Sequence, residues 1–217
     1  MTDSRSTATK TILGSASSYL VLEKIMRNII GLFGILVFGF VQVVVAEAKT
    51  YEIDPTHTFP TFEADHMGGL SLWRGKINGT SGKVIVDFEA QTGSVDISMD
   101  MSSIDFGLDK MNDHAMSDDM FDTERFPQAA YVGDLVFEAG EPVGVSGNLS
   151  IHGVTKPVGL KVNRFKCMFH PMKLAQVCGA DAETMIQRDD FGVDYAKSFG
   201  FDMGVLIRIG IEATAID

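Results

Sequence analysis

The side chains best suited to metal binding or acid–base chemistry in this chain are its five histidines: His57, His66, His114, His152 and His170. Neutral imidazole is a common metal ligand and titrates near neutral pH. However, no two of these residues have the H-x-x-x-H or H-E-x-x-H spacing that places two ligands on one face of a helix. We therefore expect them mainly to hydrogen-bond turn backbone at strand ends. A metal or acid–base site is the less favoured alternative, and we predict no bound metal.

Carboxylates gather in one short segment, at Asp113, Asp118, Asp119 and Asp122. Paired carboxylates can cleave glycosidic bonds, and spaced ones can bind Ca²⁺, but the D-x-[DN]-x-[DN]-G loop pattern is absent from the sequence. Helix capping and solvation explain the cluster more simply. The sequence also lacks G-x-S-x-G, P-loop and G-x-G-x-x-G motifs. We therefore predict no catalytic residues, no cofactor and no enzymatic activity.

A long apolar segment precedes the part of the chain that carries these groups. Residues 29–46 (IIGLFGILVFGFVQVVVA) are uncharged and apolar apart from Gln42, with Arg27 before them. A positive residue, an apolar stretch and a following A-x-A-like site are typical of a secretory signal peptide, here cleaved after Ala46 or Ala48. The stretch is close to the length of a short membrane span, so an uncleaved anchor is the alternative.

The signal segment divides the chain into two parts. Met26 is an alternative start of translation to Met1, and residues 1–48 form an N-terminal extension with the signal peptide or anchor. Residues 49–217 are long enough for one domain with a real core.

This domain has 14 basic and 26 acidic residues, a net charge of −12. So negative a surface repels phosphate backbones, which excludes nucleic acid as a partner.

Two cysteines, Cys167 and Cys178, lie in the exported part of the chain. Disulfides persist in the oxidising compartments outside the cytosol, so we expect these residues to form one rather than to remain free thiols. The chain-entropy model gives about 3 kcal/mol for closing so short a loop. A metal site is less favoured, since only His170 is near and the C-x-x-C spacing is absent. The disulfide would pin the base of a long hairpin loop.

The elements that position these groups are predicted strands, because the dominant hydrophobic period is two. Val95, Ile97, Met99 and Met101 alternate with polar residues, and residues 205–211 alternate in the same way. We predict about eight strands, at 51–54 with 57–65, 72–78, 83–89, 94–101, 129–138, 143–151, 156–167, 178–188 and 203–214. Turn signals separate several of them: Asn78-Gly79, Gln91-Thr92-Gly93, Gly140-Glu141-Pro142 and Gly153. Residues 108–121 alone have helical character.

Many short strands with few helices indicate an antiparallel sandwich or a closed barrel. Closure is favoured because it removes the sheet edges that invite aggregation. The fold class predicted from the residues is therefore all-β.

Residues 149–158, Leu-Ser-Ile-His-Gly-Val-Thr-Lys-Pro-Val, resemble the hallmark segment of the YceI-like family of polyisoprenoid-binding proteins. Four further segments resemble the family in the expected order: 51–58 (YEIDPTHT), 65–69 (DHMGG), 112–127 with its Asn-Asp-His and Phe-Pro, and 188–193 (RDDFGV). Each piece alone is weak, but five in order are specific, and they span essentially all of residues 50–214. Met120 stands where the family commonly has a second aromatic residue, and the segment around the two cysteines is longer than expected.

The resemblance implies an eight-stranded antiparallel, lipocalin-like barrel with a short helical segment at its mouth. It also implies a periplasmic location and a long apolar ligand, of the prenyl quinone or prenyl phosphate type, in a hydrophobic tunnel. An eight-stranded barrel is just wide enough for side chains or for one slender ligand. The alternating apolar residues and the methionines of the helical segment are the predicted lining: Phe88, Val95, Ile97, Met99, Met101, Phe106, Met111, Met116, Met120, Leu149, Ile151, Phe191, Val205, Ile207 and Ile209.

Four residues are candidate contacts for a ligand headgroup, because His57, His66 and His114 could gather at one mouth and Arg188 could grip a phosphate. An ion pair between Arg188 and Asp189, Asp190 or another carboxylate is the favoured alternative for that residue. Transient contact with membrane donor or acceptor proteins and a homodimer are possible partnerships. Two other functions stay open: an isoprenoid-modifying enzyme with a histidine-based site, and a ligand-free stress or interaction protein whose barrel interior is filled by its own side chains.

Overall fold

The structure, a computed structural model, describes residues 47–216. The predicted signal segment at 29–46 lies outside the described residues. The strands are β1 Lys49–Ile53, β2 Phe59–His66, β3 Ser71–Asp87, β4 Thr92–Asp105, β5 Gln128–Glu138, β6 Glu141–Ile151, β7 Val154–His170, β8 Ala175–Gln187 and β9 Gly204–Ala215. One α-helix, α2 Asp109–Met116, follows β4, and two 3₁₀ turns, η1 Arg188–Phe191 and η2 Lys197–Phe199, precede β9. No helix in the described range is both long and apolar enough to cross a membrane.

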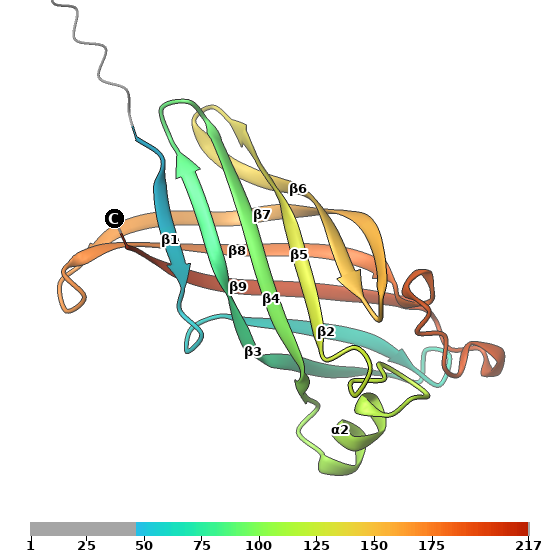
Figure 1. The fold of residues 1–217 in the computed structure, drawn as a ribbon. Helices are drawn as coiled ribbons and strands as arrows, with labels where there is room; N and C mark the ends of the chain where they lie inside the picture. Colours follow the sequence, from blue (N-terminus) through green and yellow to red (C-terminus); the bar gives the residue numbers. More distant parts are fainter. Residues whose placement is uncertain (1–46, 217) are drawn as a thin grey trace, which may run out of the picture. The chain divides into compact units, whose positions relative to one another are not determined.

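The strands close into an antiparallel barrel (Figure 1). The hydrogen-bonded order is β1-β3-β2-β9-β8-β7-β6-β5-β4, and a pairing between β3 and β4 completes the ring. β1 and β2 both pair with β3 on one side and β9 on the other, at different heights along these two long strands. They therefore share one position in the ring, and the barrel has the predicted eight positions although the described residues form nine strands.

The predicted turn at Asn78-Gly79 is wrong, because β3 runs through it as one strand of 17 residues. The pairing of β3 with β4 instead shifts register between Ile77 and Gly79, which is a β-bulge. Between the pairs Ile77–Ile104 and Gly79–Asp100, β3 has one residue and β4 has three, so the extra residues lie on β4. One of them, Ser103, accepts a hydrogen bond through its hydroxyl from the Gly79 backbone nitrogen at 2.7 Å. The bulge changes which residues face inward, so that Ile77 and Thr80 are both buried.

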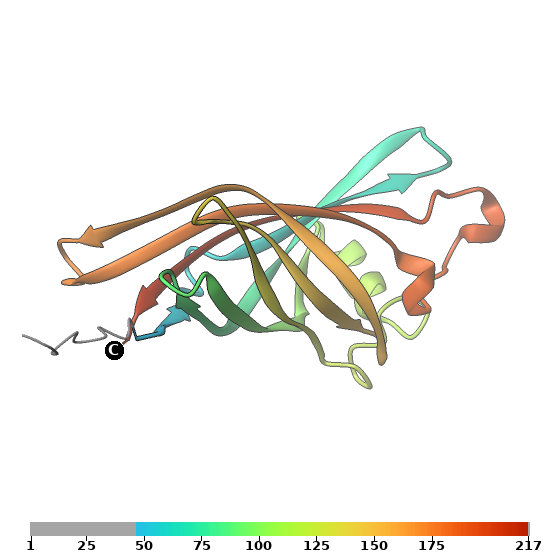
Figure 2. The same cartoon turned by 90° about the horizontal axis from the view of Figure 1, so that it is seen from above.

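Helix α2 covers one end of the barrel. Ala115 is completely buried against Ile77, Met101 and Ile104, residues of β3 and β4. The helix is shorter than the predicted segment, since it ends at Met116 and the chain continues in turns to residue 126. Figure 2 shows the β2–β3 hairpin and the η1–η2 segment at one end of the barrel and the β7–β8 turn at the other.

The predicted disulfide joins Cys167 of β7 to Cys178 of β8. The two residues are direct cross-strand partners with Cα atoms 4.0 Å apart. Their place at the base of a long loop is wrong: the strands stay paired as far as His170 and Ala175, leaving a turn of residues 171–174. The longer segment seen in the sequence is therefore an extension of the hairpin itself.

Candidate functional site

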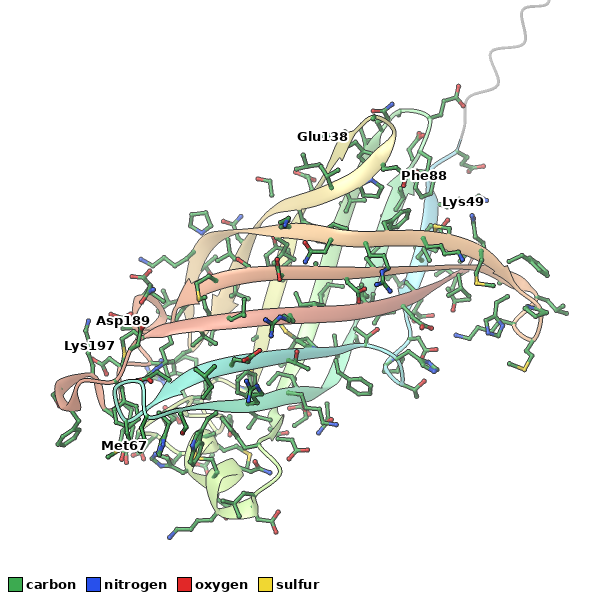
Figure 3. The ribbon with its side chains drawn as sticks, turned by 180° about the vertical axis from the view of Figure 1, so that it is seen from behind. Lys49, Met67, Phe88, Glu138, Asp189 and Lys197 are labelled. Atoms are coloured by element: carbon green, nitrogen blue, oxygen red, sulfur yellow. A yellow bond between two sulfur atoms is a disulfide. The ribbon has the colours of Figure 1, made fainter. Side chains whose placement is uncertain are left out.

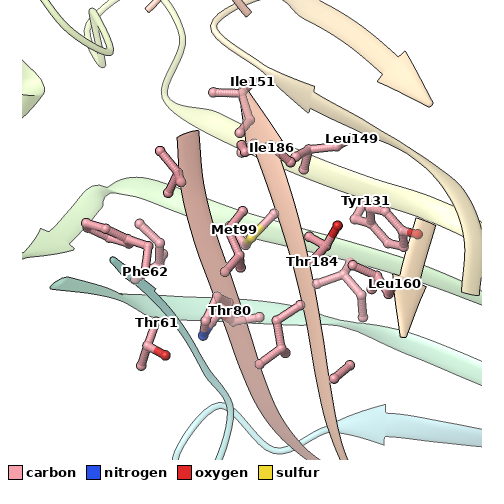
Figure 4. A pocket seen from close by; sticks show the side chains of 18 of the residues that line it. Thr61, Phe62, Thr80, Met99, Tyr131, Leu149, Ile151, Leu160, Thr184 and Ile186 are labelled. Carbon is pink, nitrogen blue, oxygen red and sulfur yellow. The ribbon is translucent and has the colours of Figure 1, made fainter. Parts of the chain in front are cut away.

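The interior of the barrel encloses a cavity of about 530 Å³. Inward-facing side chains from all nine strands surround it, and most of them are aliphatic or aromatic (Figure 4). This volume falls within the range of about 300–1,000 Å³ typical of sites for small organic ligands. The alternative of a ligand-free stress or interaction protein requires a barrel interior filled by its own side chains. The cavity argues against that alternative.

Most of the predicted lining residues surround this cavity: Val95, Ile97, Met99, Met101, Phe106, Met111, Met120, Leu149, Ile151, Phe191, Val205, Ile207 and Ile209. Those of β4 and β9 lie on one face of their strand, as the alternation of apolar and polar residues requires. Their contact with a ligand stays a prediction.

Phe88 and Met116 lie elsewhere. Phe88 follows the end of β3 at the opposite end of the barrel from Met67 and Asp189 (Figure 3). It is 37% exposed, and its ring packs on those of Phe137 and Phe165. Met116 packs into the cluster under α2 that contains Ala115. Neither the apolar character of Phe88 nor the place of Met116 in the helical segment says which side of an element faces the lumen.

Other lining residues were missed in the sequence. Phe62 and Trp73 lie toward the α2 end, Tyr131 and Leu160 line the middle of the wall, and Phe165 lies toward the disulfide. Tyr131 belongs to a weaker alternation in β5, where Ala129 and Tyr131 are buried and their neighbours are more exposed. That alternation is the feature of the sequence that could have identified Tyr131 as an inward-facing residue.

Three of the four predicted headgroup contacts line the α2 end of the cavity: His66, His114 and Arg188. The His66 ring stacks on Trp73 with centroids 4.6 Å apart, and the His114 ring meets Tyr195 edge-on at 4.7 Å. These aromatic contacts hold both imidazoles at the rim. Between residues 47 and 216, no group of three or more His, Cys, Asp or Glu side chains is arranged to hold a metal ion.

Arg188 is held by backbone carbonyls. Its two terminal nitrogens donate to the carbonyl oxygens of Val193 and Tyr195, each at 2.7 Å. Burial lowers the pKa of the guanidinium, against the attraction of Asp189, Asp194 and Asp65, but an arginine stays charged at neutral pH. Arg188 therefore holds the segment between η1 and η2 in place at the rim of the cavity. Asp189, one of its expected partners, forms its ion pair with Lys197 at 2.5 Å.

Asp65, near the end of β2, forms hydrogen bonds with two segments at the rim of the cavity. Its carboxylate accepts hydrogen bonds from the backbone nitrogens of Gly68 and Gly69 in its own turn, at 3.0 and 2.6 Å. It also accepts one from the backbone nitrogen of Asp202, at 2.9 Å. These bonds, led by the one from Asp202, lower the pKa of the Asp65 carboxyl. The β2–β3 turn and the segment before β9 are thus joined beside the cavity.

His57 lies away from the cavity, in the loop between β1 and β2. Its Nδ1 atom is 3.0 Å from Oδ2 of Asp54, which also accepts a hydrogen bond from Nζ of Lys173 at 2.7 Å. Lys173 belongs to the β7–β8 turn, so Asp54 joins two loops. His152 and His170 behave as expected for strand-end histidines, with contacts to the backbone of Phe191 and Lys173.

We expect Asp54→Asn to lower the free energy of unfolding by about 1 kcal/mol at neutral pH, since Asp54 is largely covered but Lys173 is one-third exposed. The bond from Lys173 is the largest of several that lower the pKa of the Asp54 carboxyl. A lowered pKa in the folded state means that the stabilisation is complete above about pH 4 and is lost as the pH falls through the folded-state value. Urea unfolding curves of the two proteins should therefore differ at neutral pH and approach each other below about pH 3. A difference that is constant with pH would contradict this assignment.

The fold and the site together define a class: a closed antiparallel barrel that surrounds an apolar cavity, as in proteins that hold a lipophilic ligand. The sequence match is more particular, since residues 51–215 match the YceI-like domain. The chain therefore belongs to the YceI-like domain family.

Individual relatives agree with this membership. The chain is 28% identical to Protein YceI of Salmonella agona over 171 residues, covering 77% of this chain and 87% of the relative. It is 32% identical to a UPF0312 protein of Shewanella denitrificans over 120 residues, covering 54% of this chain and 62%, less than two thirds, of the relative.

Solved structures share the fold. BcnA of Burkholderia cenocepacia superposes with a TM-score of 0.60 at 23% identity, covering 75% of this chain and 99% of that one. A domain from Saccharophagus degradans superposes with a TM-score of 0.56 at 18% identity, covering 76% and 98%. The latter is described as a polyisoprenoid binding domain implicated in plant cell wall breakdown.

Proposed function

We propose that this protein is a binding or carrier protein that holds a long apolar lipid of the polyisoprenoid type inside its barrel, without changing it chemically. The observation that carries the proposal is the apolar cavity of about 530 Å³. Membership of the YceI-like family and the polyisoprenoid-binding description of a structural neighbour support the choice of ligand class.

The free energy of such binding comes from the hydrophobic effect. Burial of apolar carbon contributes about 0.8 kcal/mol per CH₂, or about 8 kcal/mol for ten carbons, before the ligand's loss of freedom is subtracted. A prenyl tail therefore needs no covalent or charged anchor. Isoprenoid lipids reside in membranes, so a carrier protects the tail from water between a donor and an acceptor.

The location and the partners of the carrier are further parts of the proposal. The apolar segment at 29–46 supports export to the periplasm, with either a cleaved signal peptide or an anchor. Transient contacts with membrane donor or acceptor proteins would follow from the carrier role. A homodimer is compatible with it.

Native mass spectrometry of the protein, purified from a membrane-containing lysate without detergent, tests the proposal. We expect a bound species that organic solvent extracts and whose mass fits a prenyl lipid. Addition of a prenyl quinone to extracted protein should raise its melting temperature, because a ligand that binds only the folded state stabilises it. Folded protein that repeatedly yields no lipid and is not stabilised by added quinone would overturn the proposal.

A further inference from the structure

The β7–β8 hairpin exposes large apolar side chains at the end of the barrel opposite the β2–β3 hairpin (Figure 2). Four of them lie beyond the disulfide, at the end of β7 and in the turn, and are between 53% and 85% exposed: Met168, Phe169, Met172 and Leu174. Soluble proteins rarely expose a contiguous apolar patch unless it meets a partner or a membrane. Residues 168–176, which we call the hairpin tip, are therefore a candidate interaction surface.

The hairpin tip projects because the neighbouring strands stop pairing before it begins. β6 pairs with β7 as far as Lys161, and β9 pairs with β8 from Val177 onward. The two strands of the hairpin stay paired with each other as far as His170 and Ala175, three residues past the disulfide. At about 3.4 Å per residue, these residues carry the turn about 10 Å beyond the cross-link. The disulfide holds the base of this projection in register.

The charge of this part of the chain is opposite to that of the remainder. Residues 142–180, from β6 into β8, contain no Asp or Glu but five basic residues: Lys156, Lys161, Arg164, Lys166 and Lys173. The other 9 basic and 26 acidic residues of the domain give the rest of it a net charge of −17. The hairpin is thus the basic part of an acidic protein.

Some of this positive charge is compensated within the protein. The side chains of Lys161 and Arg164 lie 4.0 and 3.5 Å from carboxylates of β8. Lys173, in the turn, is paired with Asp54 at 2.7 Å. A basic side chain with a carboxylate beside it attracts a further anion only weakly, so these three residues are not the main source of positive charge at the hairpin tip.

Two lysines near the hairpin tip are not compensated in this way. Lys166 and Lys49 are both exposed, and neither forms an ion pair within residues 47–216. Lys166 precedes the disulfide and shares a small surface pocket with Glu141. Lys49 lies beside the hairpin tip, where its ammonium group donates to the side chain of Gln176 at 3.3 Å. Exposed lysines next to exposed apolar side chains are typical of proteins that attach to the surface of an anionic bilayer.

The arrangement of the apolar side chains favours a bilayer over an acidic protein as the partner. Met168 and Phe169 are consecutive in a strand, so their side chains point to opposite faces of the hairpin, and both are more than half exposed. A protein surface would cover one of these faces, whereas the interfacial region of a bilayer surrounds an inserted tip. Insertion by about 5–10 Å keeps the polar groups of the turn at the level of the hydrated headgroups.

We propose that the hairpin tip is a membrane-docking element, which inserts its four apolar side chains into the interfacial region of an anionic phospholipid bilayer while Lys49 and Lys166 meet the headgroups. The acidic remainder of the domain does not prevent docking, because physiological salt screens charges beyond about 8 Å and the turn projects about 10 Å. The inference does not depend on the proposed function, since it involves no occupant of the cavity.

Co-sedimentation of the domain with phospholipid vesicles tests the proposal. The ring of strands closes within residues 49–215, so residues 49–217 are used, without the apolar segment at 29–46 that would itself enter a membrane. We expect wild type to bind phosphatidylcholine vesicles that contain about one third phosphatidylglycerol at least tenfold more strongly than vesicles of phosphatidylcholine alone. High salt should remove most of this preference.

Two variants of the hairpin separate its apolar and basic parts. Met172→Ser/Leu174→Asn should weaken binding to the anionic vesicles at least tenfold, because it removes apolar surface from the turn. Asparagine suits position 174, where φ is 51°, so the turn should keep its conformation. Lys49→Gln/Lys166→Gln should weaken binding to the anionic vesicles about tenfold and leave binding to phosphatidylcholine alone unchanged.

The matched control is Leu70→Ser/Phe199→Ser, at the opposite end of the barrel (Figure 2). Leu70 and Phe199 are 75% and 81% exposed, about as much as the two residues replaced in the turn. This variant should bind both kinds of vesicle as wild type does. Circular dichroism checks that each variant is folded, and the lysine variant still tests the proposal if the variant of the turn is not.

Four results would overturn the inference. They are wild type that binds neither kind of vesicle, wild type that binds both equally, hairpin variants that bind as wild type does, and a control that loses as much binding as they do. A dimer in light scattering that the change in the turn converts to a monomer, without vesicle binding, would assign the hairpin tip to contact between copies instead. None of these results affects the lipid extraction that tests the proposed function.

Discussion

Replacement of Ala182 by tryptophan will abolish lipid binding while the barrel stays folded. Ala182 lies on β8, is 8% exposed and faces the cavity opposite Ile209 of β9. An indole in its place would occupy the space that the tail needs. We expect at least a tenfold loss of bound lipid in native mass spectrometry, and a loss of the increase in melting temperature on addition of a prenyl quinone.

The control is Met185→Trp on the same strand. Met185 is 61% exposed, because it lies on the outer face, so this variant adds the same ring without entering the cavity. Overpacking of a core costs about 1–3 kcal/mol, but the cavity next to Ala182 gives the indole room, and circular dichroism should show the wild-type fold. A folded Ala182→Trp variant that binds lipid as wild type does would show that the ligand does not occupy the barrel.

Loss of the disulfide will produce the largest change in stability. Cys167 and Cys178 are separated by 11 positions, and closing a loop of this length is worth about 3 kcal/mol in the chain-entropy model. The double variant Cys167→Ala/Cys178→Ala should therefore unfold at a temperature lower by about 6–12 °C, given the entropy of unfolding of a domain of this size. Calorimetry or thermal circular dichroism measures the shift.

Wild-type protein unfolded in the presence of a reductant should approach the stability of the double variant, and the reductant should leave the variant unchanged. Because Cys178 also lines the cavity, lipid binding should be measured in the same samples. Equal melting temperatures of the oxidised wild type and the double variant would show that the paired strands alone hold this hairpin. In that case the cross-link adds nothing to stability.

The local pattern of the sequence determined most of the strands. Alternation in the segment 94–101 and in the segment 205–211 gave both the strands and their inward faces, because successive side chains of a strand point to opposite sides. The alternation predicts that Val95 and Met99 of one strand face inward, and that Ile207 of another strand does so too. All three line the same cavity. The disulfide between Cys167 and Cys178 followed from a different argument, the oxidising compartment expected for an exported chain. That argument did not predict its place within a continuous hairpin.

The tertiary structure decided what depends on partners distant in the sequence. Asn78-Gly79 has the composition of a turn, but β4 pairs with β3 before and after this dipeptide and keeps the strand continuous. On the other edge of β3, β2 pairs with residues 71–76 and β1 with residues 83–86. The resulting bulge turns Thr80 inward, and a shift of one residue reverses every inward and outward position after it. Likewise, His57 lies in the loop between β1 and β2, where it contacts Asp54, whereas His66 ends β2 and lines the cavity. Composition fixes which residues can face a lumen, whereas the register between strands fixes which of them do.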